Sequence, residues 1–388
     1  MKSSGVSQVN CCTLCPRRCG AERENGQKGR CHADDKIRVA RAALHYWEEP
    51  CISGTASGCT AYAENAARLG GSGAVFFSGC PLGCIYCQNR AISRGQAGKA
   101  ISMERLAEIF LELEAQGALN INLVTAGHYA PQVCTALRLA KDQGLSLPVV
   151  WNSSGYETVE TLRMLEGLVD IYLPDLKYLD PALAKLYSHA EDYPEAAKAA
   201  IREMVRQQPR PRFAKENIEG AEASEDGKTA NRTKIAKDTN IIDDAKGMDD
   251  AEDGECLMKA GVIVRHLLLP GHVREAKHVV SYLHETYGDQ IYISLMNQYT
   301  PPADIFAKTC PKTGNADKAG DFAHTENTAR LSAALELLRR PVTKREYERL
   351  LDYAVQIGVT QGFFQEGGTA AESFIPAFDG TGVTKPAS

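Results

Sequence analysis

Short apolar runs alternate with amphipathic helical segments through most of the chain. Apolar positions recur with the helical period over residues 103–116, 131–143, 158–168, 181–207 and 273–287. Six apolar runs before and between these segments have the length of buried strands, namely residues 74–77, 120–124, 149–151, 171–173, 262–269 and 291–295. Strands that alternate with helices predict a parallel sheet with right-handed crossovers.

Polar motifs follow nearly every apolar run, and this favours a barrel. In (β/α) barrels the active-site groups gather at the carboxyl ends of the strands. We therefore predict an α/β fold with a partial (β/α)6 TIM-like barrel, followed by helices over residues 327–339 and 343–357. A doubly wound sheet has the same periodicity and remains the alternative.

Two kinds of segment stand outside this alternation. Residues 1–72 are predicted to be a Cys-rich N-terminal extension of a barrel domain that spans residues 73–388. Residues 208–255 are polar and hold most of the charge imbalance, with eight Lys/Arg against thirteen Asp/Glu, so we predict a disordered insertion. A second polar stretch covers residues 307–326. The net charge of −5 gives no indication of nucleic-acid binding.

The thirteen cysteines of the chain suggest metal binding. The first residues contain no apolar run typical of a signal peptide, and no run approaches the roughly 18 apolar residues of a membrane helix. We therefore expect a cytoplasmic protein without membrane contact. In that compartment disulfides are rare, and clustered cysteines more often bind metal.

The strongest motif is Cys80-Pro81-Leu82-Gly83-Cys84-Ile85-Tyr86-Cys87, which directly follows the first predicted strand. Three thiolates on one Gly-containing loop can hold a 4Fe–4S cluster and leave one iron open, whereas a closed cluster takes four cysteines. The alternative is a structural zinc site with a distant fourth ligand.

This motif resembles the hallmark of the radical S-adenosylmethionine (SAM) superfamily, C-x3-C-x2-C after the first barrel strand. The stretches 73–93, 152–178, 264–271 and 373–378 resemble the subgroup related to pyruvate formate-lyase activating enzymes. The resemblance implies an oxidoreductase whose open iron binds SAM through its amino and carboxylate groups. Reductive cleavage of SAM then gives a 5′-deoxyadenosyl radical, which takes hydrogen from a substrate.

The resemblance also implies which residues hold SAM. They are Gly127, Asn152, Ser153, Asp175 and Lys177, which follow predicted strands, and Arg265, which lies within the predicted strand 262–269. Asp175-Leu176-Lys177 retains a motif of the activating enzymes. Three places depart from the family, one of them at Asn297-Gln298-Tyr299, where activating enzymes carry a His. Thr125-Ala126-Gly127-His128 replaces a Gly-Gly-Glu-Pro-like form, and Asn152 stands where the activating enzymes carry Asp.

Several roles stay open at this point. His128 fits either a functional or a structural role. Arg265 fits either the SAM carboxylate or an ion pair with Asp or Glu. Glu48 and Glu49 are interpreted as turn residues rather than as contacts of a cationic substrate.

A second cysteine group precedes the barrel, with Cys12, Cys15, Cys19 and Cys31 at spacings that suit a metal. Four thiolates can bind zinc or close a second iron–sulfur cluster completely, and the spacing does not distinguish the two. Unmetallated thiols used in docking are the other interpretation.

The resemblance implies hydrogen abstraction from the glycine of a glycyl-radical enzyme, with flavodoxin or ferredoxin as the electron donor. One alternative is a radical SAM enzyme that modifies a small metabolite or another protein or peptide side chain. A different class altogether is a non-catalytic zinc-binding scaffold.

Overall fold

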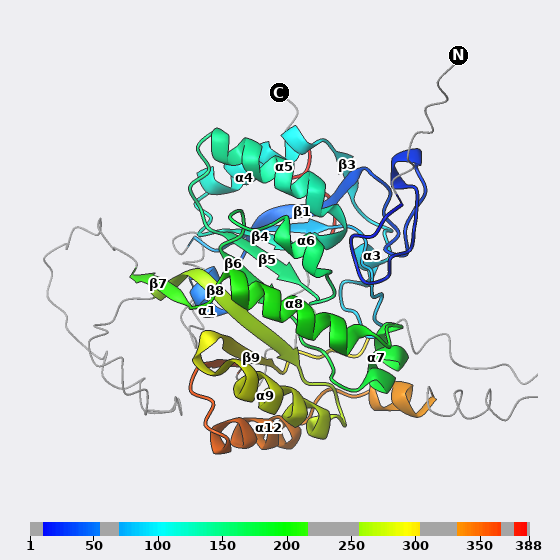
Figure 1. Ribbon diagram of the computed structural model, residues 1–388, viewed down its shortest axis with the longest axis vertical. Coiled ribbons are helices and arrows are strands. Elements are labelled where there is room, and N and C mark those ends of the chain that lie inside the picture. Colours follow the sequence, from blue (N-terminus) through cyan, green and yellow to red (C-terminus); the bar gives the residue numbers. More distant parts are fainter. Residues whose placement is uncertain (1–10, 55–69, 216–255, 303–331, 366–375, 386–388) are drawn as a thin grey trace, which may run out of the picture.

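The computed structural model describes residues 11–54, 70–215, 256–302, 332–365 and 376–385 (Figure 1). These residues form a ten-stranded sheet with helices packed against it. The core lies between the helices and the strands, where side chains of both are fully buried, among them Val75, Leu106, Phe110, Leu123, Leu137, Trp151, Tyr172, Val264 and Val280.

All six predicted strands are present and lie parallel to one another. They are β2 (Ser72–Phe77), β4 (Ile121–Val124), β5 (Val149–Ser153), β6 (Ile171–Pro174), β8 (Cys256–Leu267) and β9 (Tyr292–Met296). Every residue of β2, β4, β5 and β6 is buried, which explains why these strands are mainly apolar in the sequence. A short additional strand, β10 (Gly362–Phe364), continues the parallel sheet beyond β9.

The order of the strands confirms a barrel-like winding. Along the sheet the parallel strands follow one another as β2, β4, β5, β6, β8, β9 and β10, in the order of the chain. A doubly wound sheet would reverse its strand order at a switch point. The described strands form a path that ends at β10 and β3, which corresponds to a partial barrel.

The predicted boundary at residue 72 does not separate the N-terminal segment from the sheet. β1 (Ile37–His45) pairs antiparallel with β2, and β3 (Lys99–Ile101) pairs antiparallel with β1. Arginines at positions 38 and 41 interrupt the apolar pattern of β1, so its sequence does not stand out as a strand. Only residues 11–36 form an irregular Cys-rich segment, with the 3-10 turn η1 (Arg23–Asn25).

Residues near the end of the chain cover the outer edge of β1. The amide of Ala42 donates to the carbonyl of Thr381 at 2.9 Å, and the amide of Gly380 donates to the carbonyl of Ala40 at 3.0 Å. Gly382 has a φ of 71°, and a Cβ there would lie 2.0 Å from the carbonyl oxygen of Ala42, so only glycine fits this approach.

The predicted helices are present with changed limits. They are α4 (Met103–Ala115), α5 (Ala130–Asp142), α6 (Val159–Arg163), α7 (Pro181–Ser188), α8 (Tyr193–Gln207), α9 (Val273–Tyr287) and α12 (Lys344–Gln356). The predicted helix over 181–207 is two helices, because His189 takes a left-handed φ of 54° and ends α7. Short helices and 3-10 turns complete the set: α1 (Pro50–Ser53), α3 (Arg90–Ser93), η3 (Gly127–Tyr129) and η4 (Gly288–Gln290).

The predicted polar insertion is described only at its start. Residues 212–215 form β7 (Arg212–Lys215), which pairs antiparallel with β8, so the chain stays in the sheet beyond residue 208. Residues 216–255 and 307–326 lie outside the described part of the chain. The described residues 332–337 are helical within the predicted helix over 327–339.

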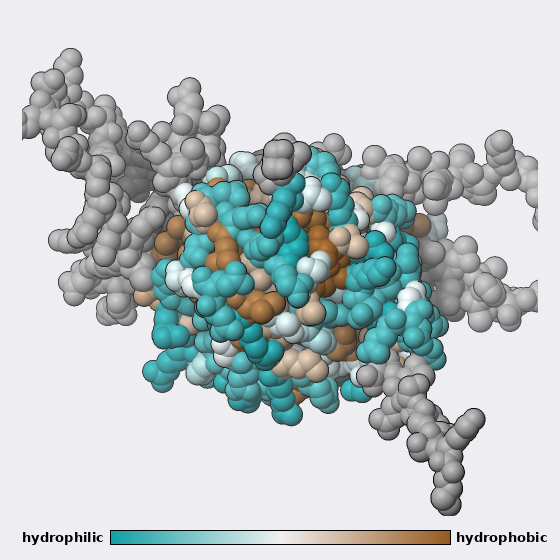
Figure 2. All heavy atoms as spheres, turned by 90° about the horizontal axis from the view of Figure 1, so that it is seen from above, coloured by the Kyte–Doolittle hydropathy of each residue, from teal (hydrophilic) through white to brown (hydrophobic). Residues whose placement is uncertain are grey.

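Seen from above, the surface is mainly hydrophilic with smaller hydrophobic areas between (Figure 2). Among the described helices, none has both the length and the apolar character needed to cross a membrane.

Candidate active site

A cavity of about 260 Å³ opens at the carboxyl ends of the parallel strands. Its walls come from the ends of β2, β4, β5, β6, β8 and β9, and from the loop that follows β2. The predicted residues Cys80, Cys84, Cys87, Asn152, Ser153, Asp175, Lys177 and Arg265 all line it. Residues separated by up to 185 positions in the chain therefore meet in one place, as the strand-end argument predicts.

The cysteine loop follows β2 and is held by its backbone. Cys80 donates its amide proton to the carbonyl of Cys31 at 3.1 Å, and Ile85 donates to the carbonyl of Tyr187 at 2.9 Å. Gly79 has a φ of 101°, and a Cβ at this position would lie 2.6 Å from the carbonyl oxygen of Cys31. The loop can therefore turn into the cavity only because residue 79 is glycine.

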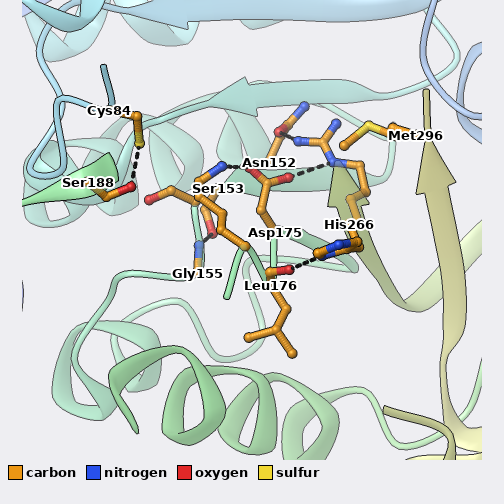
Figure 3. Close-up of polar contacts among 12 residues, drawn as sticks. Cys84, Asn152, Ser153, Gly155, Asp175, Leu176, Ser188, His266 and Met296 are labelled. Atoms are coloured by element: carbon orange, nitrogen blue, oxygen red, sulfur yellow. Dashed lines mark hydrogen bonds and ion pairs between the residues drawn. The ribbon is translucent and has the colours of Figure 1, made fainter. Parts of the chain in front are cut away.

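The three thiols share a buried environment. Burial and, to a smaller extent, the neighbouring Cys84 raise the pKa of Cys80 to about 12. Burial also raises the pKa of Cys87, again with a contribution from Cys84. The Cys84 sulfur lies 3.0 Å from the Ser188 hydroxyl (Figure 3). Buried thiols become thiolates only when a cation compensates their charge, which a metal centre does.

The three cysteines are a suitable donor set for a 4Fe–4S cluster with one open iron. In a 4Fe–4S cluster each cysteine binds a different iron, so the sulfurs surround the cluster instead of converging on one point. Three cysteines on the wall of one cavity match that requirement.

A buried ion network forms the opposite part of the wall (Figure 3). Asp175 accepts from Lys177 Nζ at 2.6 Å and from Arg265 Nε at 3.1 Å. Burial alone would raise the pKa of Asp175, but Lys177 and Arg265 outweigh it, and the pKa is lowered. In return, Asp175 raises the pKa of Lys177 against the effect of burial. These three side chains are therefore charged at neutral pH.

Arg265 has its anionic partners within the protein. Besides Asp175 it contacts Glu48, with 3.3 Å between Nη1 and Oε2, and it donates to the side-chain oxygen of Asn152. Arg265 therefore forms the ion pairs of the second interpretation, and a contact with SAM stays a prediction. The interpretation of Glu48 as a turn residue is wrong, because its carboxylate lines the cavity and also accepts from Asn122.

Gly127 and His128 lie behind the cavity wall rather than on it. Among the described residues after β4, Val124 and Thr125 line the cavity, and Thr125 takes a left-handed φ of 60°. His128 is buried, its ring contacts the carbonyl of Ser78 at 2.8 Å, and burial lowers its pKa to about 4. His128 therefore supports the cysteine loop as a neutral ring, which is the structural role.

The N-terminal cysteines form a separate thiol group beside the cysteine loop. The backbone amides of Arg17, Ala21 and Ala33 donate to the sulfurs of Cys15, Cys19 and Cys31, in each case from two residues further along the chain. Burial and, to a smaller extent, charges on the other cysteines of the group raise the pKa of Cys15 to about 12. Cys12, Cys15, Cys19 and Cys31 are thus close neighbours.

Arg17 and Arg23 fasten this group to the rest of the site. Arg17 donates to the carbonyls of Pro81, in the cysteine loop, and of Ser188, at the end of α7. Arg23 is buried and donates to the carbonyls of Asp34 and His128. Both arginines therefore hold irregular segments through backbone oxygens.

Residues 74–210 match the family model of the radical SAM superfamily. These residues form a radical SAM domain. The radical SAM domain begins in β2 and ends just after α8, so it includes the cysteine loop and the ends of β4, β5 and β6. A radical SAM domain implies a 4Fe–4S cluster and SAM, in agreement with the donor set described above. The resemblance to activating enzymes remains a prediction.

Comparisons with other proteins extend beyond the radical SAM domain. An uncharacterised protein of Methanocaldococcus jannaschii, MJ0674, is 28% identical over 189 residues, which are 47% of this chain and 50% of that protein. This chain therefore spans about half the length of the relative it matches.

Similar solved structures include SuiB of Streptococcus suis bound to S-adenosylmethionine, with 12% identity and a TM-score of 0.37 over 75% of this chain and 49% of that one. The hydrogenase maturase HydG of Carboxydothermus hydrogenoformans has 13% identity and a TM-score of 0.36 over 76% and 58% of the two chains.

Proposed function

We propose that this protein is a radical SAM enzyme that abstracts hydrogen from a substrate. The observation that carries the proposal is the meeting of Cys80, Cys84 and Cys87 with a buried ion network on the walls of one cavity. When bound, the cluster supplies the electron that cleaves SAM to methionine and a 5′-deoxyadenosyl radical.

The chain's own residues would position SAM and exclude water. Lys177 is held by Asp175 and presents a fixed positive charge to the cavity, where a carboxylate of SAM is a suitable partner. Asn152 is held by Arg265 and Glu48, so its orientation is also fixed. Groups that are fixed before the ligand arrives lower the cost of ordering it.

Metal analysis and electron paramagnetic resonance of anaerobically purified protein test this proposal. We expect about four irons or more per chain and a reduced-cluster signal that changes when SAM is added. Cys84→Ala should lose this signal. Cys134→Ala is the matched control, because Cys134 is equally buried but lies outside the cavity and contacts the carbonyl of Met164. Protein that contains zinc alone, without a SAM-sensitive signal, would contradict the proposal.

We further propose that the hydrogen donor is a glycine of a glycyl-radical enzyme, with flavodoxin or ferredoxin as the reductant. The retained Asp175-Leu176-Lys177 motif, with both charged side chains in the cavity wall, supports this. Incubation with candidate glycyl-radical enzymes under reducing anaerobic conditions should produce an organic radical signal in the partner. The signal should be absent with Cys84→Ala. SAM cleavage that accelerates only with a small metabolite or another peptide would instead favour the alternative substrates.

We also propose that Cys12, Cys15, Cys19 and Cys31 hold a second metal centre, either zinc or a closed iron–sulfur cluster. Amide protons directed at three of the four sulfurs support the proposal, because such hydrogen bonds stabilise thiolates. Cys15→Ser should lower the zinc content by one ion or the iron content by about four per chain. Unchanged zinc and iron in this variant would favour unmetallated thiols.

A further inference from the structure

Glu157 is a buried carboxylate for which the proposed function has no role. Its side chain lies behind the cavity wall, and 6% of the residue is exposed. In the part of the chain that the structure describes, its hydrogen-bond partner is the hydroxyl of Ser153, at 3.2 Å, and it has no ion pair. A buried carboxylate without a cation is costly, so this group needs an explanation.

Ser153 connects Glu157 to the cavity. A serine hydroxyl has one proton and two lone pairs. The proton goes to Glu157. One lone pair accepts the amide proton of Gly155 at 3.2 Å (Figure 3). One lone pair therefore remains, and Ser153 lines the cavity. As long as Glu157 is ionised, the Ser153 hydroxyl can act toward a ligand only as a hydrogen-bond acceptor.

The surroundings of Glu157 leave its protonation state adjustable. Burial and, to a smaller extent, the nearby Asp175 raise its pKa to about 7, although the hydrogen bond from Ser153 acts in the opposite direction. Asp175 itself is compensated by Lys177 and Arg265. On the other side, a Cβ at Gly127 would lie 3.2 Å from Glu157 Oε1, so the glycine makes room for the carboxylate. His128, next to Gly127, is neutral and faces Ser78.

We propose that Glu157, acting through Ser153, takes up the proton that the amino group of the ligand loses on binding. This rests on the proposed function, in which the amino group of SAM binds the open iron. An amine must be deprotonated before it binds a metal. Glu157, in the loop after β5, would thus supply the carboxylate that is missing after β4, where Ala126-Gly127 stands in place of a Gly-Glu pair in the form that the resemblance implies.

The step is balanced. The ammonium nitrogen gives one proton to the Ser153 oxygen, and the Ser153 hydroxyl gives its own proton to Glu157 Oε2. The amine then has a free lone pair, and the carboxyl group is neutral. An α-amino group has an ordinary pKa of about 7.7–8.0, so the transfer is close to thermoneutral before the metal bond is formed. Glu157 is a positioning residue, because it acts through Ser153.

Calorimetric titration of the anaerobic, cluster-loaded enzyme with SAM tests the proposal. Titrations in two buffers with different ionisation enthalpies give the number of protons released per SAM bound. Near pH 7.5, Glu157→Gln should release up to one proton more than the wild type. Glu203→Gln is the control, since Glu203 is also buried but is paired with Arg206 far from the cavity.

The pH dependence separates this role from a structural one. Near pH 5.5 Glu157 is already protonated, so wild type and Glu157→Gln should release the same number of protons. Equal release at pH 7.5 as well would overturn the proposal, even if the variant binds SAM more weakly. Absence of SAM binding by the wild-type enzyme would overturn the proposed function and this inference together.

Discussion

Replacement of Asp175 by asparagine tests how strongly the ion network holds the cavity wall. The side chain of Asp175 is 17% exposed and accepts charge-assisted hydrogen bonds from Lys177 and Arg265. Asparagine keeps the shape but has only one acceptor oxygen, and its amide protons face a cation. Arg265 then keeps its contact with Glu48, whereas Lys177 loses its ion pair with Asp175.

The expected cost follows from these contacts. A hydrogen bond to a charged group contributes about 1.5–3 kcal/mol, and removal of one partner from a buried pair costs about 3–5 kcal/mol. We therefore expect Asp175→Asn to lower the free energy of unfolding by about 3–5 kcal/mol at pH 7. The control is Glu191→Gln, which breaks the exposed pair with Lys185 and should cost about 1 kcal/mol or less.

The pH dependence has a definite sign. The folded-state pKa of Asp175 is lowered, so its contribution is present above the unfolded pKa of about 3.9 and is lost as the pH falls through the folded value. The difference in the free energy of unfolding between wild type and Asp175→Asn should thus be the same at pH 7 and at pH 5, and it should become smaller below about pH 4. Urea unfolding under anaerobic conditions, with iron content matched, measures it. A loss no larger than that of Glu191→Gln would refute the reasoning.

Three further variants probe single features. Gly79→Ala places a Cβ 2.6 Å from the Cys31 carbonyl and should abolish cluster incorporation, measured as iron per chain, while Gly117→Ala, with open space around it, should retain the iron. Arg17→Lys removes the guanidinium group that donates to the carbonyls of both Pro81 and Ser188. We expect this variant to lose iron faster during dialysis, while its helix content, measured by circular dichroism, stays unchanged. Thr343→Ala breaks the capping box of α12 and should lower the free energy of unfolding, measured with urea, by about 1 kcal/mol. An unchanged free energy would show that this cap does not contribute to stability.

The parallel strands could be predicted from the sequence because they are buried on both faces. β5, for example, has five buried residues in succession, and its apolar start at residue 149 is visible without any structure. β1 could not be predicted in this way, because its solvent-facing positions carry arginines and its partners are β2 and β3. β10 is three residues long, which is too short for a periodic signal.

In the candidate site, the residues of a local motif could be predicted from the sequence, whereas contacts between residues far apart in the chain could not. Cys80, Cys84 and Cys87 are recognisable from their spacing, because a cluster loop is a local feature of the chain. The partner of Arg265 is not, since Glu48 lies 217 positions away and any acidic residue satisfies the same chemistry. Glu157 gives no sequence signal of its own, because it reaches the cavity through Ser153.

Because β1 pairs with the segment around Thr381, this pairing can form only after nearly the whole chain has been synthesised. Thr381 follows Ala42 by 339 positions, and ribosomes add about 5–20 residues per second, so roughly 17–70 s separate the two partners. During that interval the outer edge of β1 offers unpaired backbone groups to any neighbouring chain. The arginines at 38 and 41, which obscure this strand in the sequence, are the kind of charged residue that keeps such an edge from aggregating.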